Sequence, residues 1–95
     1  MLTTRATVIT ANPSINLKKL CRHFGHKIEA RFDDRQGEIH FPFGRATLEA
    51  HDDRLLLAGQ AEDGAQLDRL EQVLGDHLLR FANKESLTID WQRDT

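Results

Sequence analysis

The stretch Leu20-Cys21-Arg22-His23-Phe24-Gly25-His26-Lys27 marks the place where the hydrophobic period of the chain changes. Up to Phe24 the apolar residues recur at helical spacing, at i, i+3, i+4 and i+7: Leu17, Leu20, Cys21 and Phe24. Gly25 follows this stripe, and glycine accepts the left-handed conformation in which many helices end. The stretch therefore predicts the end of a helix, which Asn12-Pro13 begins with a capping residue and a proline at the first position.

Downstream of this point, apolar residues alternate with polar ones. Ile28, Ala30 and Phe32 alternate with charged residues, which is typical of a strand with one buried face. The same alternation predicts four further strands, around residues 38–41, 46–50, 55–61 and 87–91, and a first strand at residues 3–10 upstream. Turn chemistry at 33–37 and a break at 42–44 separate the first three of these downstream strands.

A second helix is expected after Asp63, whose side chain can cap it, with Gln66 completing a capping-box-like pair. Asn83 is expected to close this helix in a left-handed conformation. Its apolar stripe falls at helical spacing: Leu67, Leu70, Leu74, Leu78 and Phe81.

The predicted order is strand, helix, four strands, helix, strand. Each helix has one apolar stripe and each strand one apolar face, so the economical arrangement packs both helices on one face of a sheet. We therefore predict a two-layer α+β fold with a curved antiparallel sheet of about six strands, the four consecutive strands forming a meander. At 95 residues the chain fits one domain, residues 1–95.

Composition narrows the classes of function. The formal net charge is −2, with 13 Lys and Arg residues against 15 Asp and Glu, so no basic surplus is present for nucleic acid binding. No apolar run approaches the ~18 residues of a membrane-spanning helix, so no membrane insertion is expected. One cysteine cannot form an internal disulfide, and no secretory signal follows Met1, which favours a cytoplasmic location.

The candidate metal ligands lie in the opening stretch. Cys21, His23 and His26 are spaced C-x-H-x-x-H, and thiolate with imidazole suits zinc, iron or copper. His40, on the polar side of a predicted strand, would be the additional ligand of such a metal or haem site. The alternative is structural: Cys21 packs as a small hydrophobic residue, and His23 interacts with the negative end of the helix dipole.

A second candidate site is the segment Phe41-Pro42-Phe43-Gly44-Arg45. In an extended segment Phe41 and Phe43 point to the same side. Either both rings pack under the helices, or Phe43 lines an exposed apolar groove for a ligand or partner. Arg45 could pair with an anionic group of that ligand, or with Glu38 across the hairpin.

Six segments together resemble a bacterial family of small proteins known as domain of unknown function 2218. The family has no established activity, so the resemblance implies a single domain and no residue role. Similar proteins are sometimes encoded near iron or siderophore uptake functions, which implies an iron-linked expectation for Cys21, His23 and His26. The segments are Asn12-Pro13, Lys18-Lys19-Leu20-Cys21-Arg22-His23-Phe24-Gly25-His26-Lys27, Phe32-Asp33-Asp34, Gly37-Glu38-Ile39, Phe41-Pro42-Phe43-Gly44 and Leu87-Thr88-Ile89-Asp90-Trp91.

The sequence contains no phosphate-loop or dinucleotide fingerprint, and no nucleophile, base and orienting group can be assembled from spacing. We therefore predict a binding or protein-interaction module and not an enzyme. Its ligand-binding candidates are His23, His26, Phe43 and Arg45. A homodimer or a protein partner is expected through a sheet edge or the Phe41–Phe43 segment. The alternative is a binder of a metal, haem or siderophore-linked ligand through the Cys21/His23/His26 region.

Overall fold

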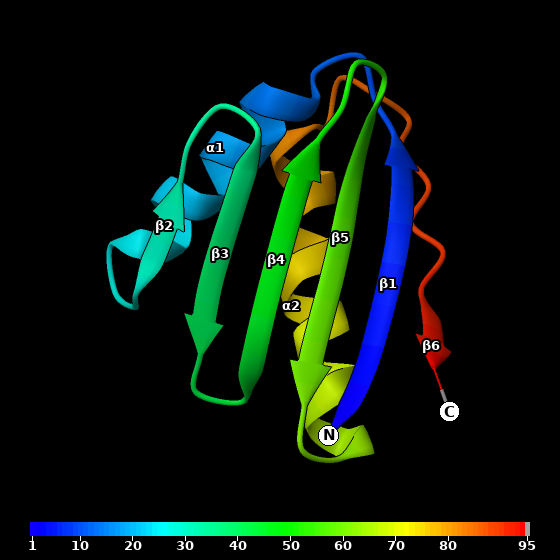
Figure 1. Ribbon diagram of the computed structural model, residues 1–95. Coiled ribbons are helices and arrows are strands. Elements are labelled where there is room, and N and C mark those ends of the chain that lie inside the picture. Colours follow the sequence, from blue (N-terminus) through cyan, green and yellow to red (C-terminus); the bar gives the residue numbers. More distant parts are fainter. Residues whose placement is uncertain (95) are drawn as a thin grey trace.

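The computed structural model describes residues 1–94 and confirms the predicted α+β fold. One antiparallel sheet carries both helices on the same face, so that the opposite face is uncovered (Figure 1). The elements in chain order are β1 (Leu2–Ile9), α1 (Pro13–Gly25), β2 (Ala30–Phe32), β3 (Gln36–Phe41), β4 (Gly44–Ala50), β5 (Arg54–Ala61), α2 (Gly64–Phe81) and β6 (Gln92–Asp94).

The strand order across the sheet is β2-β3-β4-β5-β1-β6. The four consecutive strands β2 to β5 form the predicted meander, and β1 pairs antiparallel with β5 along its whole length. The two outer strands, β2 and β6, have only three residues each. No helix of residues 1–94 is long and apolar enough to cross a membrane.

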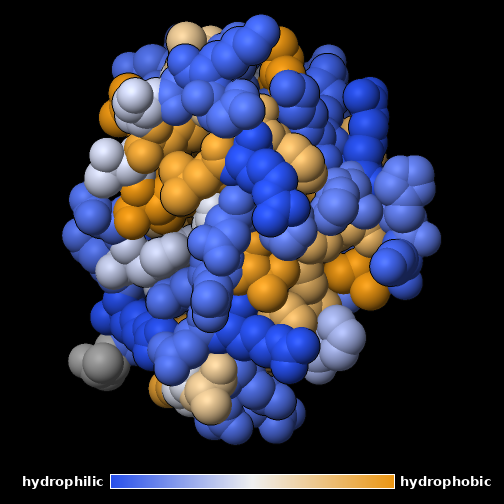
Figure 2. All heavy atoms as spheres, turned by 180° about the vertical axis from the view of Figure 1, so that it is seen from behind, coloured by the Kyte–Doolittle hydropathy of each residue, from blue (hydrophilic) through white to orange (hydrophobic). Residues whose placement is uncertain are grey.

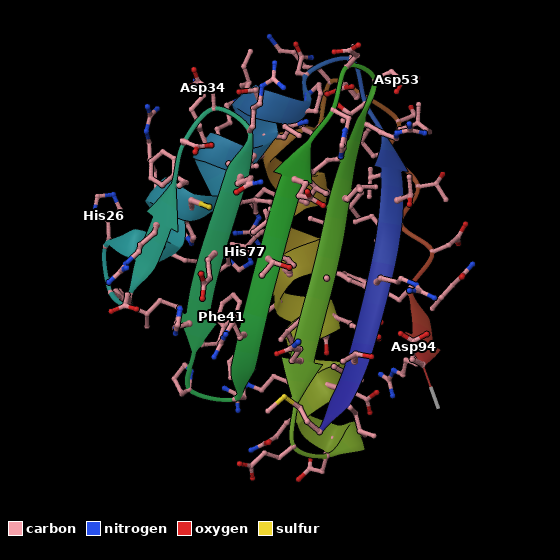
Figure 3. All side chains as sticks on the ribbon, viewed as in Figure 1. His26, Asp34, Phe41, Asp53, His77 and Asp94 are labelled. Carbon is pink, nitrogen blue, oxygen red and sulfur yellow. The ribbon has the colours of Figure 1, made fainter. Side chains whose placement is uncertain are left out.

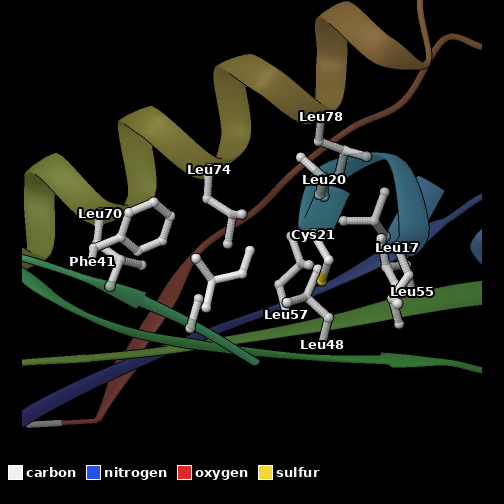
Figure 4. Packing of buried hydrophobic residues seen from close by; sticks show 13 residues of the cluster. Leu17, Leu20, Cys21, Phe41, Leu48, Leu55, Leu57, Leu70, Leu74 and Leu78 are labelled. Carbon is white, nitrogen blue, oxygen red and sulfur yellow. The ribbon is translucent and has the colours of Figure 1, made fainter. Parts of the chain in front are cut away.

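The core lies between the sheet and the helices (Figure 4). The stripe of α2 is buried as predicted, with Leu67, Leu70, Leu74 and Leu78 fully shielded from solvent, and each such leucine contributes roughly 1.5 to 3 kcal/mol. In α1 Leu17, Leu20 and Cys21 are fully buried, whereas Phe24 is half-buried at the margin. The margin of this core is where aromatic rings reach the surface.

Helix α1 lies very close to β3 at Gly37. A Cβ atom built on Gly37 would lie 2.7 Å from Cys21 Sγ and 3.3 Å from a methyl carbon of Leu17. Contacts as short as the first do not occur between real side chains, so the thiol occupies the space that any larger residue at position 37 would need. Cys21 is therefore a packing residue between helix and sheet.

The expected left-handed helix ends were wrong. No residue among 1–94 has a positive φ. Helix α1 does end at Gly25, but His26 follows in right-handed helical conformation, and its N–H donates to the Phe24 carbonyl. Helix α2 ends through Ala82 at φ −105°, whose N–H donates to Leu78. At the other end the Asp63 cap is confirmed, because its carboxylate accepts from the Gln66 N–H at 2.8 Å.

The predicted last strand was also misplaced. Leu87, Ile89 and Trp91 are half-buried while the residues between them are exposed, so the alternation is real. They nevertheless lie outside any strand, and β6 begins only at Gln92. These side chains pack against the core beside α2, where the δ-methyl carbon of Ile89 and the indole nitrogen of Trp91 face Gly75. Burial against a helix produces the same alternation as pairing in a sheet.

Candidate functional site

The four candidate metal ligands lie in different environments. Cys21 is buried in the core, and this burial raises the pKa of its thiol to about 11, which keeps it protonated. His40 points to the uncovered face of the sheet, where its Nε2 lies 2.7 Å from Glu38 Oε1. His26 is exposed beyond the end of α1 (Figure 3). Within residues 1–94 no group of three or more His, Cys, Asp or Glu side chains is arranged to hold a metal ion. The structure therefore does not bring the four candidate ligands together, and a metal site at any of them stays a prediction.

His23 instead meets a residue far away in the sequence. Its ring centroid lies 4.8 Å from that of His77 on α2 and 5.3 Å from that of Phe81. His77 also contacts Phe24, at 4.9 Å between centroids. The C-terminal half of α2 therefore meets the end of α1 through aromatic and imidazole rings.

This contact continues as a row across the molecule. Phe24 packs edge-on against Phe41 at 4.9 Å, and Phe41 stacks on Phe43 at 5.0 Å. The guanidinium carbon of Arg69 lies 5.0 Å from the Phe43 ring centroid, a cation–π contact. We call these rings the aromatic row: Phe81, His23, His77, Phe24, Phe41 and Phe43.

The two imidazoles of the row have different surroundings. His77 Nδ1 lies 2.7 Å from the Val73 carbonyl oxygen and donates a hydrogen bond to it. The pKa of His23 is lowered, first by desolvation and then by the nearby positive charges of His77, His26, Arg80 and Lys27. Cationic side chains therefore gather around His23, so an additional positive charge there is unfavourable.

At one end, the aromatic row reaches a groove of about 400 Å³ beside the β3–β4 turn. Phe43 is half-buried there, and both Phe43 and Arg45 line the groove. Arg45 already has an acidic neighbour, since its Nε lies 3.8 Å from Glu38 Oε1. Because Arg45 is paired with Glu38 and Glu62 also lines the groove, the groove has no unpaired arginine to offer an anion.

At its other end, the row borders a cleft of about 260 Å³ between α1 and the end of α2. We call it the interhelical cleft. Apolar surface comes from Phe81 and from Ile15, which is 50% exposed, and Figure 2 shows hydrophobic surface between hydrophilic side chains on this helix-bearing face. Lys19 and Lys84 also line the cleft, and neither forms an ion pair with any residue of the described chain.

One wall of the cleft contains a polar network that the sequence patterns did not predict. The Glu85 carboxylate accepts hydrogen bonds from the Thr10 hydroxyl at 2.7 Å and from the Ala11 N–H at 2.9 Å. The amide nitrogens of Asn12 and Asn16 lie 3.4 and 3.3 Å away and also donate to it. These hydrogen bonds lower the pKa of Glu85, with the Thr10 hydroxyl as the largest cause. The carboxylate is thus held by neutral donors and offsets only part of the lysine charge.

A signal for this network was present in the sequence. Asn16 precedes Leu17 and lies four residues before Leu20, so helical spacing places it at the buried stripe. A polar side chain at such a position requires a hydrogen-bond partner. The partner, Glu85, lies 69 residues away, and nothing in a local pattern identifies it.

Two carboxylates on the opposite edge of α2 are hydrogen-bonded within the chain. Arg93 on β6 donates to both oxygens of Glu71, at 3.0 Å each, and to Asp68. Glu71 also accepts from the hydroxyl of the buried Thr4 at 2.7 Å. These carboxylates raise the pKa of Arg93, with Glu71 the larger cause. Helix α2 thus has an acidic edge, where Glu71 and Asp68 share the Arg93 guanidinium, and a basic edge that adjoins the cleft.

Comparison with known proteins gives the family of this chain. The sequence model of a family described as an uncharacterized protein conserved in bacteria, DUF2218, matches residues 5–92. The chain belongs to this family. Among solved structures, the DUF2218 chain is similar to the NMR structure of PA4090 from Pseudomonas aeruginosa, with a TM-score of 0.82 and 36% sequence identity over 97% of this chain and 96% of that one. No curated protein matches it.

Proposed function

We propose that this protein is a non-catalytic binding module whose interhelical cleft takes a small anionic ligand with an apolar or aromatic part. The observation that carries the proposal is that the Phe81 ring lines the same cleft as Lys19 and Lys84, two lysines that form no ion pair in the described chain. His23 adds a ring and lies among further cations. A cleft that combines apolar walls with a few polar groups is the usual design of a small-molecule site.

The size of the cleft limits the ligand. A volume of about 260 Å³ lies just below the roughly 300 Å³ at which sites for drug-sized ligands begin. One or two rings with a single carboxylate or sulfonate therefore fit, whereas a large cofactor would extend well beyond the walls. The groove at Phe43 is larger, but Glu38 already neutralises its arginine.

A structural explanation of the same cations makes a different prediction. Positive side chains near the C-terminal ends of helices stabilise the helix dipole, and Arg80 and His23 lie in such last turns. Lys19 lies in the middle of α1, and Lys84 lies beyond α2, where the dipole effect is weak. If the cations served only the helices, their removal would lower stability and leave ligand binding unchanged.

The test is a titration with 2-naphthoate and with its uncharged counterpart 2-naphthamide, followed by ¹H–¹⁵N correlation NMR. About 13 non-hydrogen atoms at roughly 0.3 kcal/mol each give ~4 kcal/mol, a Kd of about 1 mM. We expect naphthoate to bind at about this strength and the amide at least threefold more weakly.

The Lys19→Ala variant should lose about twofold to fivefold in affinity for naphthoate, the value of an exposed charge pair. Lys18→Ala is the matched control, because Lys18 points away from the cleft and pairs with Asp34 at 2.8 Å. Equal affinity for acid and amide, or equal effects of the two lysine variants, would contradict the proposal.

A further inference from the structure

Asn16 is a nearly fully buried polar residue that lines the interhelical cleft. It is 2% exposed, whereas Lys19, one turn further along α1, is exposed at the same cleft. Buried polar atoms are almost always hydrogen-bonded, because leaving one without a partner costs free energy. Which atoms of the Asn16 amide have partners therefore decides what this residue can still bind.

The amide nitrogen of Asn16 is fully used within the chain. Its Nδ2 lies 3.1 Å from the Thr10 hydroxyl oxygen and 3.3 Å from Glu85 Oε2, which gives one acceptor to each of its two N–H bonds. An ionised carboxylate only accepts hydrogen bonds, so the nitrogen and not the oxygen of the amide faces Glu85. The orientation of the amide is thereby fixed, with Oδ1 directed away from the Glu85 carboxylate.

The amide oxygen of Asn16 has no such partner. Within residues 1–94 the side chain makes its hydrogen bonds through Nδ2, and no N–H or O–H group donates to Oδ1. In the same part of the chain, no buried side-chain nitrogen or oxygen lacks a partner, which means that Oδ1 is not sealed in the core. Because the interhelical cleft is the opening that Asn16 lines, Oδ1 is a fixed acceptor that faces this cleft.

We propose that Asn16 Oδ1 accepts a hydrogen bond from the ligand of the interhelical cleft, which is then an aromatic carboxylate that also carries a hydroxyl or N–H donor. This inference rests on the proposed function of the cleft and narrows the class of its ligand. Asn16 lies three residues before Lys19, a spacing that places two side chains on the same face of a helix. The lysine attracts the carboxylate, and the amide oxygen selects the donor.

Water is the alternative partner of Asn16 Oδ1. A ligand that displaces a bound water without supplying a donor loses that hydrogen bond, whereas a ligand hydroxyl replaces it. We expect the hydroxyl to add about threefold to tenfold in affinity, the usual net value of one hydrogen bond between neutral groups. If Oδ1 made no contact with the ligand, the more apolar methyl ether would bind at least as tightly, since burying a hydroxyl without a partner is unfavourable. The two explanations predict opposite orders of affinity.

The experiment is a ¹H–¹⁵N NMR titration of the whole chain with 2-naphthoates that carry a hydroxyl at ring position 4, 6 or 7. The methyl ether of each acid and the amide of each compound complete the series. We expect at least one hydroxy acid to bind about threefold to tenfold more tightly than both 2-naphthoate and its own methyl ether. The side-chain amide signals of Asn16 should shift more with that acid than with its ether.

Two variants assign the preference to Asn16. Asn16→Ala should abolish the preference for the hydroxyl and keep the preference for acid over amide. Asn12→Ala is the matched control, because Asn12 also lines the cleft and also donates to Glu85, at 3.4 Å, but is exposed. It should leave the hydroxyl preference unchanged. Circular dichroism checks that both variants fold, and the ligand series on the wild-type chain decides the question if Asn16→Ala does not.

The outcomes separate this inference from the proposed function. The Asn16 contact is contradicted if no hydroxy acid binds more tightly than its methyl ether, or if Asn12→Ala reduces the preference as much as Asn16→Ala. In either case a preference for acids over amides would still support the binding function of the cleft. A hydroxyl preference with equal binding of acids and amides would support the Asn16 contact and remove the role of the lysines. Absence of binding by every compound would contradict both proposals.

Discussion

The two edges of α2 differ in how their charges are balanced. On the acidic edge, Glu71 and Asp68 receive Arg93 from β6, and Ile89 and Trp91 cover the adjoining surface. On the basic edge, His77 and Arg80 lie beside His23 of α1, and the nearby Lys19 and Lys84 form no ion pair in the described chain. Glu71 and Asp68 on one edge are thus paired within the chain, whereas Lys19 and Lys84 beside the other edge are not.

The difference shows which charged groups need an explanation beyond stability. A carboxylate that is paired within the chain is accounted for by the fold. The two lysines beside the Phe81 ring are only partly accounted for in this way, because Glu85 is the one acidic residue that lines the cleft with them and it forms no ion pair with either in the described chain. The basic edge is therefore where we place the binding function, although the protein as a whole carries a net charge of −2.

The largest effects should come from removing one ring at each edge. Trp91→Ala and Phe81→Ala each delete a half-buried aromatic side chain, and we expect each to lower the free energy of unfolding by about 2 kcal/mol, below the range for fully buried rings. Only Phe81→Ala should also weaken 2-naphthoate binding, because only Phe81 lines the cleft. Urea denaturation and NMR titration measure the two effects. Equal losses of affinity would remove the distinction between the edges.

A smaller loss is expected from the network that anchors residues 82–86 beside the cleft. Thr10 is 3% exposed, and its hydroxyl donates to Glu85. Thr10→Val keeps the volume and removes the donor, so the free energy of unfolding should fall by about 1 to 2 kcal/mol. Thr7→Val, on the exposed face of β1, is the control and should be nearly neutral. A neutral Thr10→Val would mean that the Glu85 network contributes little.

The same network predicts a pH dependence. The pKa of Glu85 is lowered in the folded chain, so the unfolded chain binds the proton more readily. The Glu85 carboxylate therefore adds to the free energy of unfolding above the ordinary glutamate pKa of about 4.3. This stabilisation is lost as the pH falls from that value through the lower pKa that Glu85 has in the folded chain. Glu85→Gln should flatten this part of the stability profile, measured by thermal unfolding from pH 6 to 2. An unchanged slope would contradict the assignment.

The smallest effect on stability should come from Lys19→Ala. Lys19 is exposed and unpaired, so we expect the free energy of unfolding to change by less than about 0.5 kcal/mol. The twofold to fivefold loss of naphthoate affinity would then occur without a stability defect. A large loss of stability would instead indicate that Lys19 supports the helix.

Most of the fold follows from local sequence patterns. The change of period near Gly25, the leucine stripe of α2 and the alternation in β3 to β5 all predicted elements that the structure contains. The misplaced last strand has a specific cause, since Ile89 and Trp91 alternate because they pack beside Gly75 of α2. Period alone does not distinguish a strand from a chain segment laid on a helix.

The candidate site was less predictable, because its residues are distant in the sequence. His23 was identified, but its partners His77 and Phe81 come from a helix that starts almost forty residues after α1 ends. Cys21 shares a short motif with His23, yet their side chains point to the core and to the surface. A short motif fixes spacing along the chain, whereas the site is formed by packing between the helices.

The most direct test of the binding proposal is a map of backbone amide shifts in the wild-type chain at saturating 2-naphthoate. We predict that the largest shifts cluster at Ile15, Lys19, His23 and Phe81, with little change at Gly75 and Trp91 on the acidic edge. Shifts that are scattered, or largest on the acidic edge, would contradict the assignment of function to the basic edge of α2.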